Sequence, residues 1–348
     1  MKNFINKIKS TDFSKIDFYT FKKMAKITSI LLLLILFYAL FQIYIPVNPV
    51  SHETITYKVE KGWGNDDIAK DLKNLGMIRS SYFFQFYTIL SFNHKELKAG
   101  RYMISKDMSI HKIAKKMSKG DVLRDRFVIY EGWNVSDIGK YFESRDLCTK
   151  EEFKEIAEQD YSKEYKFLID KPENVGIEGY LFPDTYEVAE GQSCQDIIKK
   201  MLVNFGEKLN PEIIAKIQSQ QKTIFEVITI ASLLEKEVKT LEDKKIVSGI
   251  LQKRLDIGMP LQLDATVNYI TGKNDPSVSI KSTQIDSPYN TYKYPGLPKG
   301  PISNPGLDSI IASLEPTESD YLYYLSNGKT FFAKTFQEHV ANKEKYLK

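Results

Sequence analysis

A glutamate at the end of an apolar segment is the residue of this chain best suited to acid–base chemistry. Residues 223–238 read TIFEVITIASLLEKEV, apolar on nearly every face and without Gly or Pro, which predicts a helix buried inside a globular domain. Glu235 shares a face of that helix with Ala231 and Ile224. Such a carboxyl group is paired, exposed at the helix end, or kept partly protonated by desolvation, and the last state makes a general acid. The alternative is an ordinary charged helix end, and Glu237 stands two residues further on.

A second segment combines aromatic and acidic side chains within ten residues. Residues 177–186 read IEGYLFPDTY, and their Gly and Pro predict a loop or an edge strand. Sugar-binding clefts use aromatic faces together with carboxylates, because pyranose C–H faces stack on rings while the hydroxyls need acceptors. The opposite interpretation is a turn whose aromatic rings belong to the core. The candidate substrate-binding residues of this segment are Glu178, Tyr180, Phe182 and Tyr186.

Two segments after the buried helix carry polar residues that could hydrogen-bond a substrate. Residues 258–267 alternate polar and apolar side chains, which predicts a strand with one polar face. Residues 287–306 hold much of the chain's Pro and Gly, and twenty residues without a regular element are uncommon in a compact domain unless they are functional. The candidate substrate-binding residues in these segments are Gln262, Asp264, Asn290 and Tyr292.

The residue types that bind metals and cofactors are sparse. The four His residues are scattered without paired spacing, and Cys148 and Cys194 are the only cysteines. The chain lacks HExxH, GxSxG, GxGxxG and GxxxxGK[ST]. We therefore predict no metal and no cofactor. Whether the two cysteines form a disulfide stays open, since they are forty-six positions apart.

The positive charge of the chain is concentrated at its N-terminus. Residues 1–26 contain seven Lys against two Asp, a balance of +5, which leaves about −1 for the rest of a chain whose formal net charge is +4. The body of the protein is not basic, so a nucleic-acid partner has no electrostatic support.

An uncharged apolar run follows the basic tail. Residues 27–45 are nineteen residues long, and at about 1.5 Å per residue a helix of that length nearly matches the roughly 30 Å hydrocarbon core of a bilayer. The Lys residues on its N-terminal side place residues 1–26 in the cytoplasm and residues 46–348 outside the cell. The alternative is a cleaved signal peptide, but the run is longer than a usual signal h-region and no small-x-small cleavage pattern follows it.

A weak internal repeat organises the first half of the remaining chain. Four segments each predict a strand, a tight turn and a helix: 57–72, 102–117, 127–142 and 186–201. The position of the helix N-cap holds a cap-competent residue in every copy: Gly64, Ser109, Asn134 and Ser193. The spacing between copies is irregular, so these are reused strand–helix units and not a solenoid.

Further elements are predicted from local signals. Helices are expected near residues 80–90, 244–255, 307–314 and 335–346, and a closing hairpin near residues 321–333 turns at Asn327-Gly328. The chain is thus expected to be an α+β protein with these parts: a cytoplasmic tail (1–26), a transmembrane helix (27–45), a small α+β module (46–123) and a mixed α+β catalytic domain (124–348).

Five sequence blocks stand in the same order as the signature blocks of a known family. They are Glu178–Tyr186 (EGYLFPDTY), Ala231–Glu237 (ASLLEKE), Leu261–Val267 (LQLDATV), Ser287–Tyr292 (SPYNTY) and Gly296–Gly306 (GLPKGPISNPG). The chain resembles the endolytic murein transglycosylases of the YceG-like family over roughly residues 27–348. Its residues 46–123 resemble the LysM-like module that binds N-acetylglucosamine-containing glycans, although a purely structural spacer is the alternative.

The resemblance implies a bacterial membrane-anchored enzyme that cuts nascent glycan strands of peptidoglycan between MurNAc and GlcNAc, in association with cell-wall synthases. It implies that Glu235 is the catalytic residue, with Glu237 left open as the alternative. The acid would protonate the glycosidic oxygen, and the resulting base would draw the MurNAc C6 hydroxyl onto C1 as a 1,6-anhydro product. Two other classes remain: a hydrolase that uses Asp264 as a separate base, and a non-catalytic scaffold that binds peptidoglycan and recruits synthases.

Overall fold

The computed structural model describes residues 18–91, 97–273, 275 and 277–347. It confirms the predicted mixed α+β fold. Residues 1–17, most of the predicted basic tail, lie outside the described residues. The chain divides into two compact units, which we describe separately: residues 1–124 with 189–191, and residues 125–188 with 192–348.

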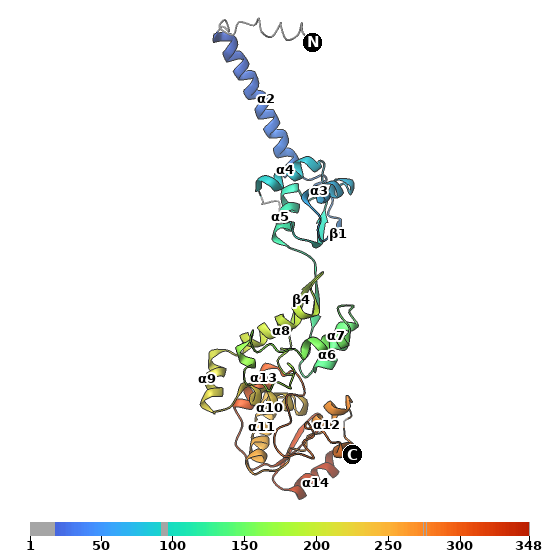
Figure 1. Cartoon of the computed structure of the whole chain (residues 1–348), viewed down its shortest axis with the longest axis vertical. Coiled ribbons are helices and arrows are strands. Elements are labelled where there is room, and N and C mark those ends of the chain that lie inside the picture. Colours follow the sequence, from blue (N-terminus) through green and yellow to red (C-terminus); the bar gives the residue numbers. More distant parts are fainter. Residues whose placement is uncertain (1–17, 92–96, 274, 276, 348) are drawn as a thin grey trace. The chain divides into compact units, whose positions relative to one another are not determined.

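The first unit begins with one long apolar helix, drawn in blue in Figure 1. The elements of this unit are α2 (Phe18–Tyr44), β1 (Thr54–Val59), α3 (Asn65–Asn74), α4 (Ser81–Ser91), β2 (Gly100–Ser105) and α5 (Ile110–Lys119). Within the described residues, α2 is the single helix long and apolar enough to cross a membrane. Strands β1 and β2 are antiparallel, with Thr54 opposite Ser105 and Val59 opposite Gly100. Helices α3, α4 and α5 each bury one side against this pair in one core.

The second unit carries the remaining elements. They are β3 (Arg124–Val128), α6 (Val135–Glu143), α7 (Lys150–Ala157), η3 (Lys166–Leu168), β4 (Thr185–Ala189), α8 (Cys194–Lys208), α9 (Pro211–Ser219), α10 (Ile224–Glu237), α11 (Leu241–Asp256), α12 (Asp264–Thr271), η4 (Ser282–Gln284), α13 (Leu307–Leu314), β5 (Tyr323–Ser326), β6 (Thr330–Ala333) and α14 (Phe336–Tyr346). Strand β3 pairs with β4, and β5 pairs with β6. The predicted hairpin and the predicted helices after residue 223 are confirmed, as is the irregular loop before α13.

The strand–turn–helix repeat is also confirmed. Each of the four predicted residues is the N-cap of its helix. In three copies the N-cap side chain accepts a hydrogen bond from the backbone N–H three residues on: Ser109, Asn134 and Ser193. Gly64 caps without a side chain, and the Asp67 carboxylate accepts from its N–H at 2.9 Å. The repeat therefore reuses one local device, a capped helix start directly after a strand.

The predicted buried helix, α10, lies at the centre of the second unit among α11, α12 and α13 (Figure 1). Thr223 is its N-cap and forms a capping box with Glu226. Every residue from Val227 to Leu234 is buried. A helix without an exposed face in its middle has its position fixed by the surrounding core. The carboxyl groups of its last turn are therefore held at defined places.

The prediction of a strand at residues 258–267 is wrong. The segment is irregular up to Leu263, and α12 begins at Asp264. Gln262 has φ 51°, a left-handed conformation that interrupts an extended chain. Alternation over a few residues does not distinguish a strand from a bend followed by a helix, and Asp264 suits the first turn of a helix.

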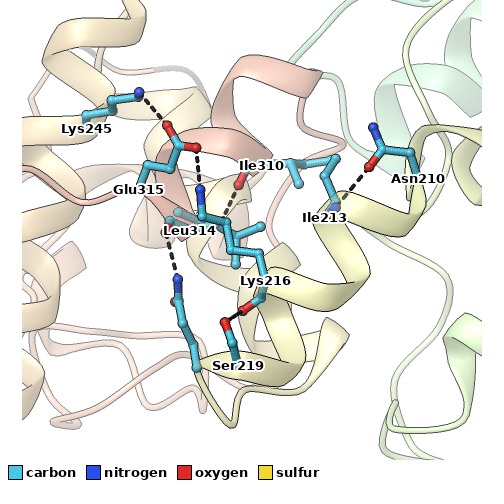
Figure 2. A network of polar contacts seen from close by, with 10 residues as sticks. Asn210, Ile213, Lys216, Ser219, Lys245, Ile310, Leu314 and Glu315 are labelled. Carbon is cyan, nitrogen blue, oxygen red and sulfur yellow. Dashed lines mark hydrogen bonds and ion pairs between the residues drawn. The ribbon is translucent and has the colours of Figure 1, made fainter.

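Helix α13 is fixed at its C-terminal end by a polar network. Figure 2 shows the Glu315 carboxylate between Lys216 of α9 and Lys245 of α11. Hydrogen bonds from these two ammonium groups lower the pKa of Glu315 to about 2. Gln220 adds a hydrogen bond to the Leu314 carbonyl at 2.8 Å. The opposite end of α13 faces the last turn of α10, so this network helps to hold that end in place.

A disulfide joins Cys148 to Cys194, the first residue of α8. Their Cα atoms are 6.1 Å apart, and the bond closes a loop of 46 positions. The pairing that the sequence left open is thus made in the structure.

Candidate active site

Two carboxyl groups leave the last turn of α10 on nearly opposite sides. Glu235 and Glu237 are two residues apart, and two steps around an α-helix amount to roughly 200°. One side chain faces α11 and the start of α13, and the other faces the start of α12 and strand β5. These two surroundings differ in their hydrogen-bond donors.

Glu235 lies in a set of donors. The Lys244 Nζ is 3.2 Å from both of its carboxylate oxygens, the Gly306 N–H donates at 3.0 Å and the Ser309 hydroxyl at 2.6 Å. The Glu235 side chain is 9% exposed and that of Lys244 is 3% exposed. Gly306 is the N-cap residue of α13, so the carboxylate also lies at the positive end of a helix. Every contact suits a carboxylate that holds α10, α11 and α13 together.

A third carboxyl group, which the sequence analysis did not select, lies beside this ion pair. A Cβ atom built on Gly306 would stand only 1.9 Å from Oε1 of Glu131, so the missing side chain leaves room for this carboxyl group. The Glu131 residue is exposed. Burial raises its pKa, and the charge of Glu235 adds to the effect while Lys244 opposes it. No local sequence signal brings Glu131 together with a glycine so far along the chain.

Glu237 lies among fewer donors. The Tyr324 hydroxyl donates to its carboxylate at 2.9 Å, and the Ala265 N–H also donates to it. Burial raises the pKa of Glu237 to about 7, and the nearby Asp264 charge raises it further against the opposing hydrogen bonds. The residue is only partly buried. At neutral pH this carboxyl group therefore holds a proton part of the time and can still release it.

Asp264 and Tyr292 join the Glu237 surroundings. The Tyr292 hydroxyl donates to Oδ1 of Asp264, the first residue of α12. Gln262 is exposed two residues earlier, and its N–H bonds the Thr291 carbonyl at 3.1 Å. The structure thus brings together three of the predicted site residues, with Gln262 close by in the chain. Tyr324 comes from the closing hairpin, and the sequence analysis did not select it as a site residue.

A cleft of about 880 Å³ lies within the second unit, and the chain neighbours of Glu237 and Asp264 line part of it. Lys236 and Ala265 line it, and Ala265 is also the residue whose N–H bonds Glu237. Two tyrosines line the cleft with ring centroids 5.0 Å apart, Tyr269 and Tyr289. The sequence analysis chose neither of them, although Tyr289 stands inside the SPYNTY block.

Glu178 lies at this cleft and is 6% exposed. It accepts hydrogen bonds from the Val135 N–H at 3.0 and 3.2 Å, from Asn304 Nδ2 at 3.0 Å and from the Tyr269 hydroxyl at 3.4 Å. Burial raises its pKa to about 8 despite these bonds. Glu178 is thus a protonated, fully engaged group at neutral pH that orients its neighbours.

The other predicted site residues are engaged inside the protein. Tyr180, Phe182 and Tyr186 are at most 6% exposed and belong to the hydrophobic core, so their rings offer no face to a sugar. The Asn290 side chain is 1% exposed, and its amide donates to the carbonyls of Thr283 and Ile285 at 3.0 and 2.7 Å. It holds the loop that carries Tyr292.

The described part of the chain contains no set of side chains arranged to bind a metal ion. There, His, Cys, Asp and Glu form no group of three or more that could hold a metal ion. The groups that the described site offers are carboxyl groups and tyrosine hydroxyls, which are able to exchange protons.

The fold and the site together define a mixed α+β protein with a cleft and several closely placed, partly or fully buried carboxyl groups. A model of the YceG-like family matches residues 57–345. The chain belongs to the YceG-like family.

Characterised and solved relatives agree with this membership. The chain is similar to the endolytic murein transglycosylase of Bacillus subtilis, with 33% identity over 87% of each chain. It is 30% identical to the protein of the same name from Streptococcus pneumoniae, covering 86% of this chain and 59% of that relative's length. A crystal structure of a putative YceG-like protein from Listeria monocytogenes is 31% identical, with a TM-score of 0.57 over 83% of this chain and 99% of that one.

Proposed function

We propose that this protein is an endolytic peptidoglycan transglycosylase that cleaves the bond between MurNAc and GlcNAc in nascent glycan strands. The names of the Bacillus and Streptococcus relatives and the acid–base centre support the proposal. Helix α2 would anchor the enzyme, with its catalytic unit outside the cytoplasm and near cell-wall synthases. The apolar surface of α2 and the Lys residues before it favour that orientation.

The general acid in this proposal is Glu237 and not Glu235. The resemblance alone favoured Glu235, but the two environments reverse that preference. A general acid works best with a pKa near the working pH, and burial raises the pKa of Glu237 to about 7. The single observation that carries the assignment is the contrast in partners: Glu237 accepts from one tyrosine hydroxyl and one N–H, whereas Glu235 is engaged by a buried ammonium group and two further donors. Both oxygens of Glu235 are already bonded to Lys244, and two further donors face one of them.

The reaction would use one carboxyl group twice. Protonated Glu237 gives its proton to the glycosidic oxygen as an oxocarbenium-like state develops. The Glu237 carboxylate then takes the proton of the MurNAc C6 hydroxyl, whose oxygen closes onto C1 to form the 1,6-anhydro ring. The bond to GlcNAc breaks and no water enters, so the atoms balance without a second nucleophile. Tyr324 would hold the Glu237 carboxyl group in place through both steps.

The cleft beside Ala265 is the proposed binding site for the glycan. Tyr269 and Tyr289 offer aromatic surface for sugar rings, and Lys236 offers a cation at the wall. Glu178 would position Tyr269 through the hydrogen bond between them. Glu178 itself is too closely surrounded by donors to reach a glycosidic oxygen, so we assign it a positioning role.

A hydrolase is the second candidate, and one contact favours it. Asp264 lies close enough to Glu237 to raise its pKa, and it could serve as the separate base that activates water. The two reactions differ in their products: a transglycosylase leaves 1,6-anhydroMurNAc ends, and a hydrolase leaves reducing ends.

The deciding experiment is mass spectrometry of purified peptidoglycan digested by the full-length chain in detergent, beside Glu237→Gln and Glu235→Gln. Anhydro-ended fragments with wild type and with Glu235→Gln, but not with Glu237→Gln, are expected. Reducing ends would favour the hydrolase and point to Asp264. Anhydro products lost with Glu235→Gln and kept with Glu237→Gln would return the role to Glu235. No cleavage by a folded wild type that binds glycan would favour a scaffold that recruits synthases.

A further inference from the structure

Helix α4 carries an apolar face that none of the described residues of the first unit covers. Its sequence, SYFFQFYTILS, contains no charged residue. Tyr82 is 79% exposed, Phe86 53%, Ile89 59% and Leu90 69%. These positions recur at intervals of four, three and one, so they share one side of the helix. The opposite side packs into the core through Phe84, which is fully buried.

This face adjoins the end of the apolar helix α2. The two helices pack together: Tyr38 meets Phe83 edge to face at 5.7 Å, and Tyr44 meets Tyr87 at 6.5 Å. The guanidinium of Arg79, just before α4, donates to the Ile45 carbonyl at 2.7 Å. The position of α4 relative to the last turns of α2 is therefore fixed by rings and by a charged cap.

The exposed apolar surface of α2 extends to the point where α4 meets it. Leu34 is 59% exposed, Phe41 is 40% exposed and Tyr44 is 51% exposed. The face of α4 thus continues the surface of α2, and the Arg79 guanidinium at their junction is bound to the Ile45 carbonyl and lies over the Phe41 ring. Aromatic residues mark the levels at which a helix that crosses a bilayer leaves the hydrocarbon, and α4 packs at Tyr38 and Tyr44, at the C-terminal end of α2.

We propose that α4 is an interfacial helix whose Tyr82–Leu90 face lies in the outer leaflet of the membrane that α2 crosses. The proposal rests on the membrane anchoring in the proposed function. An apolar helix face of this kind enters the boundary between headgroups and acyl chains by about 5–10 Å. Lipid is the occupant because the face is uncharged and is continuous with a surface that itself requires lipid. The first unit would then be held against the bilayer at two points and not by a flexible stalk alone.

The test places environment-sensitive probes on the full-length chain in vesicles of phosphatidylethanolamine and phosphatidylglycerol. Phe86→Cys carries a fluorophore on the α4 face, and the native cysteines are in a disulfide and do not react. Lys61→Cys is the matched control, because it is exposed beyond the end of β1 where Val59 pairs with Gly100. The other end of that strand pair adjoins the chain that leaves α2, since the Asn48 N–H bonds the Lys106 carbonyl at 3.0 Å.

Emission from position 86 is expected to shift to the blue and to lose at least half its intensity to shallow nitroxide lipids, while position 61 stays solvent-like. A third probe at Leu34→Cys, within α2, separates the two proposals. Quenching at position 34 by deep nitroxides together with solvent-like emission at position 86 would overturn the interfacial helix and leave the anchor standing. Absence of quenching at position 34 would overturn the anchor and with it this inference.

Discussion

The two sides of the last turn of α10 give neighbouring carboxyl groups different surroundings. On one side, Glu235 meets a buried ammonium group, a helix N-terminus and a hydroxyl. On the other side, Glu237 meets one tyrosine hydroxyl, one N–H and the negative charge of Asp264. Both residues are partly buried, so burial alone does not separate them. In the proposed function, the number and charge of the groups that face each oxygen separate a structural carboxylate from a proton donor.

The largest expected effect is on the reaction rate. Glu237→Gln keeps the size of the side chain but cannot transfer a proton, so the rate of glycan cleavage should fall about 10²–10⁴-fold, the usual contribution of general acid–base catalysis. Glu235→Gln should stay within about tenfold of wild type when rates are normalised to folded protein, because it lies on the structural side. The comparison fails if the two variants exchange these effects.

The next effect is on stability and concerns Glu235. Glu235→Ala leaves the Lys244 ammonium buried without its partner, which typically costs about 3–5 kcal/mol in the free energy of unfolding. Urea denaturation followed by circular dichroism measures it. Replacing both partners, Glu235→Gln with Lys244→Met, should recover most of the loss since no buried charge remains. A loss below about 1 kcal/mol in the single variant would show that the ion pair is not structural.

The pH profile of wild type provides the third measurement. Glu237 must be protonated to act as the acid, so kcat/KM should fall as the pH rises through about 7, by about tenfold per pH unit above it. Glu235→Gln should show the same fall in kcat/KM above pH 7. If this fall in kcat/KM were absent in Glu235→Gln, the titrating acid would lie on the other side of the helix.

Much of the fold follows from local signals in the sequence, whereas the assignment of the two glutamates does not. Capped helix starts such as Ser109 and Asn134, and the Asn-Gly hairpin, act within a few residues and could be predicted. Two helices that were missed had similar signals: Thr149 with Glu152 as a capping box for α7, and Asn210 before a proline for α9. Helix α12 was misread because the bend at Gln262 depends on tertiary contacts.

The site depends on residues far apart in the chain. The Glu235 donor Ser309 lies 74 positions away, and the Glu237 donor Tyr324 lies 87 positions away. The sequence places both glutamates on one helix end but does not say which face meets which partner. The same limit explains the aromatic residues: composition indicated a sugar site, but the segment around Tyr180 packs inward while Tyr269 lines the cleft.

The buried carboxyl group of Glu178 extends the comparison, and the expected effect on the free energy of unfolding is smaller. Its folded-state pKa of about 8 lies above the unfolded value of 4.5, so the folded protein binds the extra proton between these values. Wild type therefore loses stability as the pH rises towards 8, by up to about 1.4 kcal/mol per pH unit. Glu178→Gln has no such proton, and its free energy of unfolding relative to wild type should rise from pH 6 to 8 and level off above. Glu237 titrates in both proteins and cancels. A constant difference across this range would contradict the raised pKa.

The smallest effect tests whether the Glu235 side contributes any chemistry through its exposed neighbour, Glu131. Gly306→Ala would put a methyl group where Oε1 of Glu131 now lies, yet the backbone there (φ −74°, ψ 171°) accepts alanine. Glu131 is the mobile end of an exposed side chain, so it should turn away, and the cost should stay near the roughly 1 kcal/mol of a weakened N-cap. Cleavage should remain within about threefold of wild type, with Glu131→Gln as the matched variant that keeps Gly306. If both variants instead lost more than tenfold while Glu237→Gln kept activity, proton transfer would run between Glu131 and Glu235, and the roles of the two sides of α10 would be reversed.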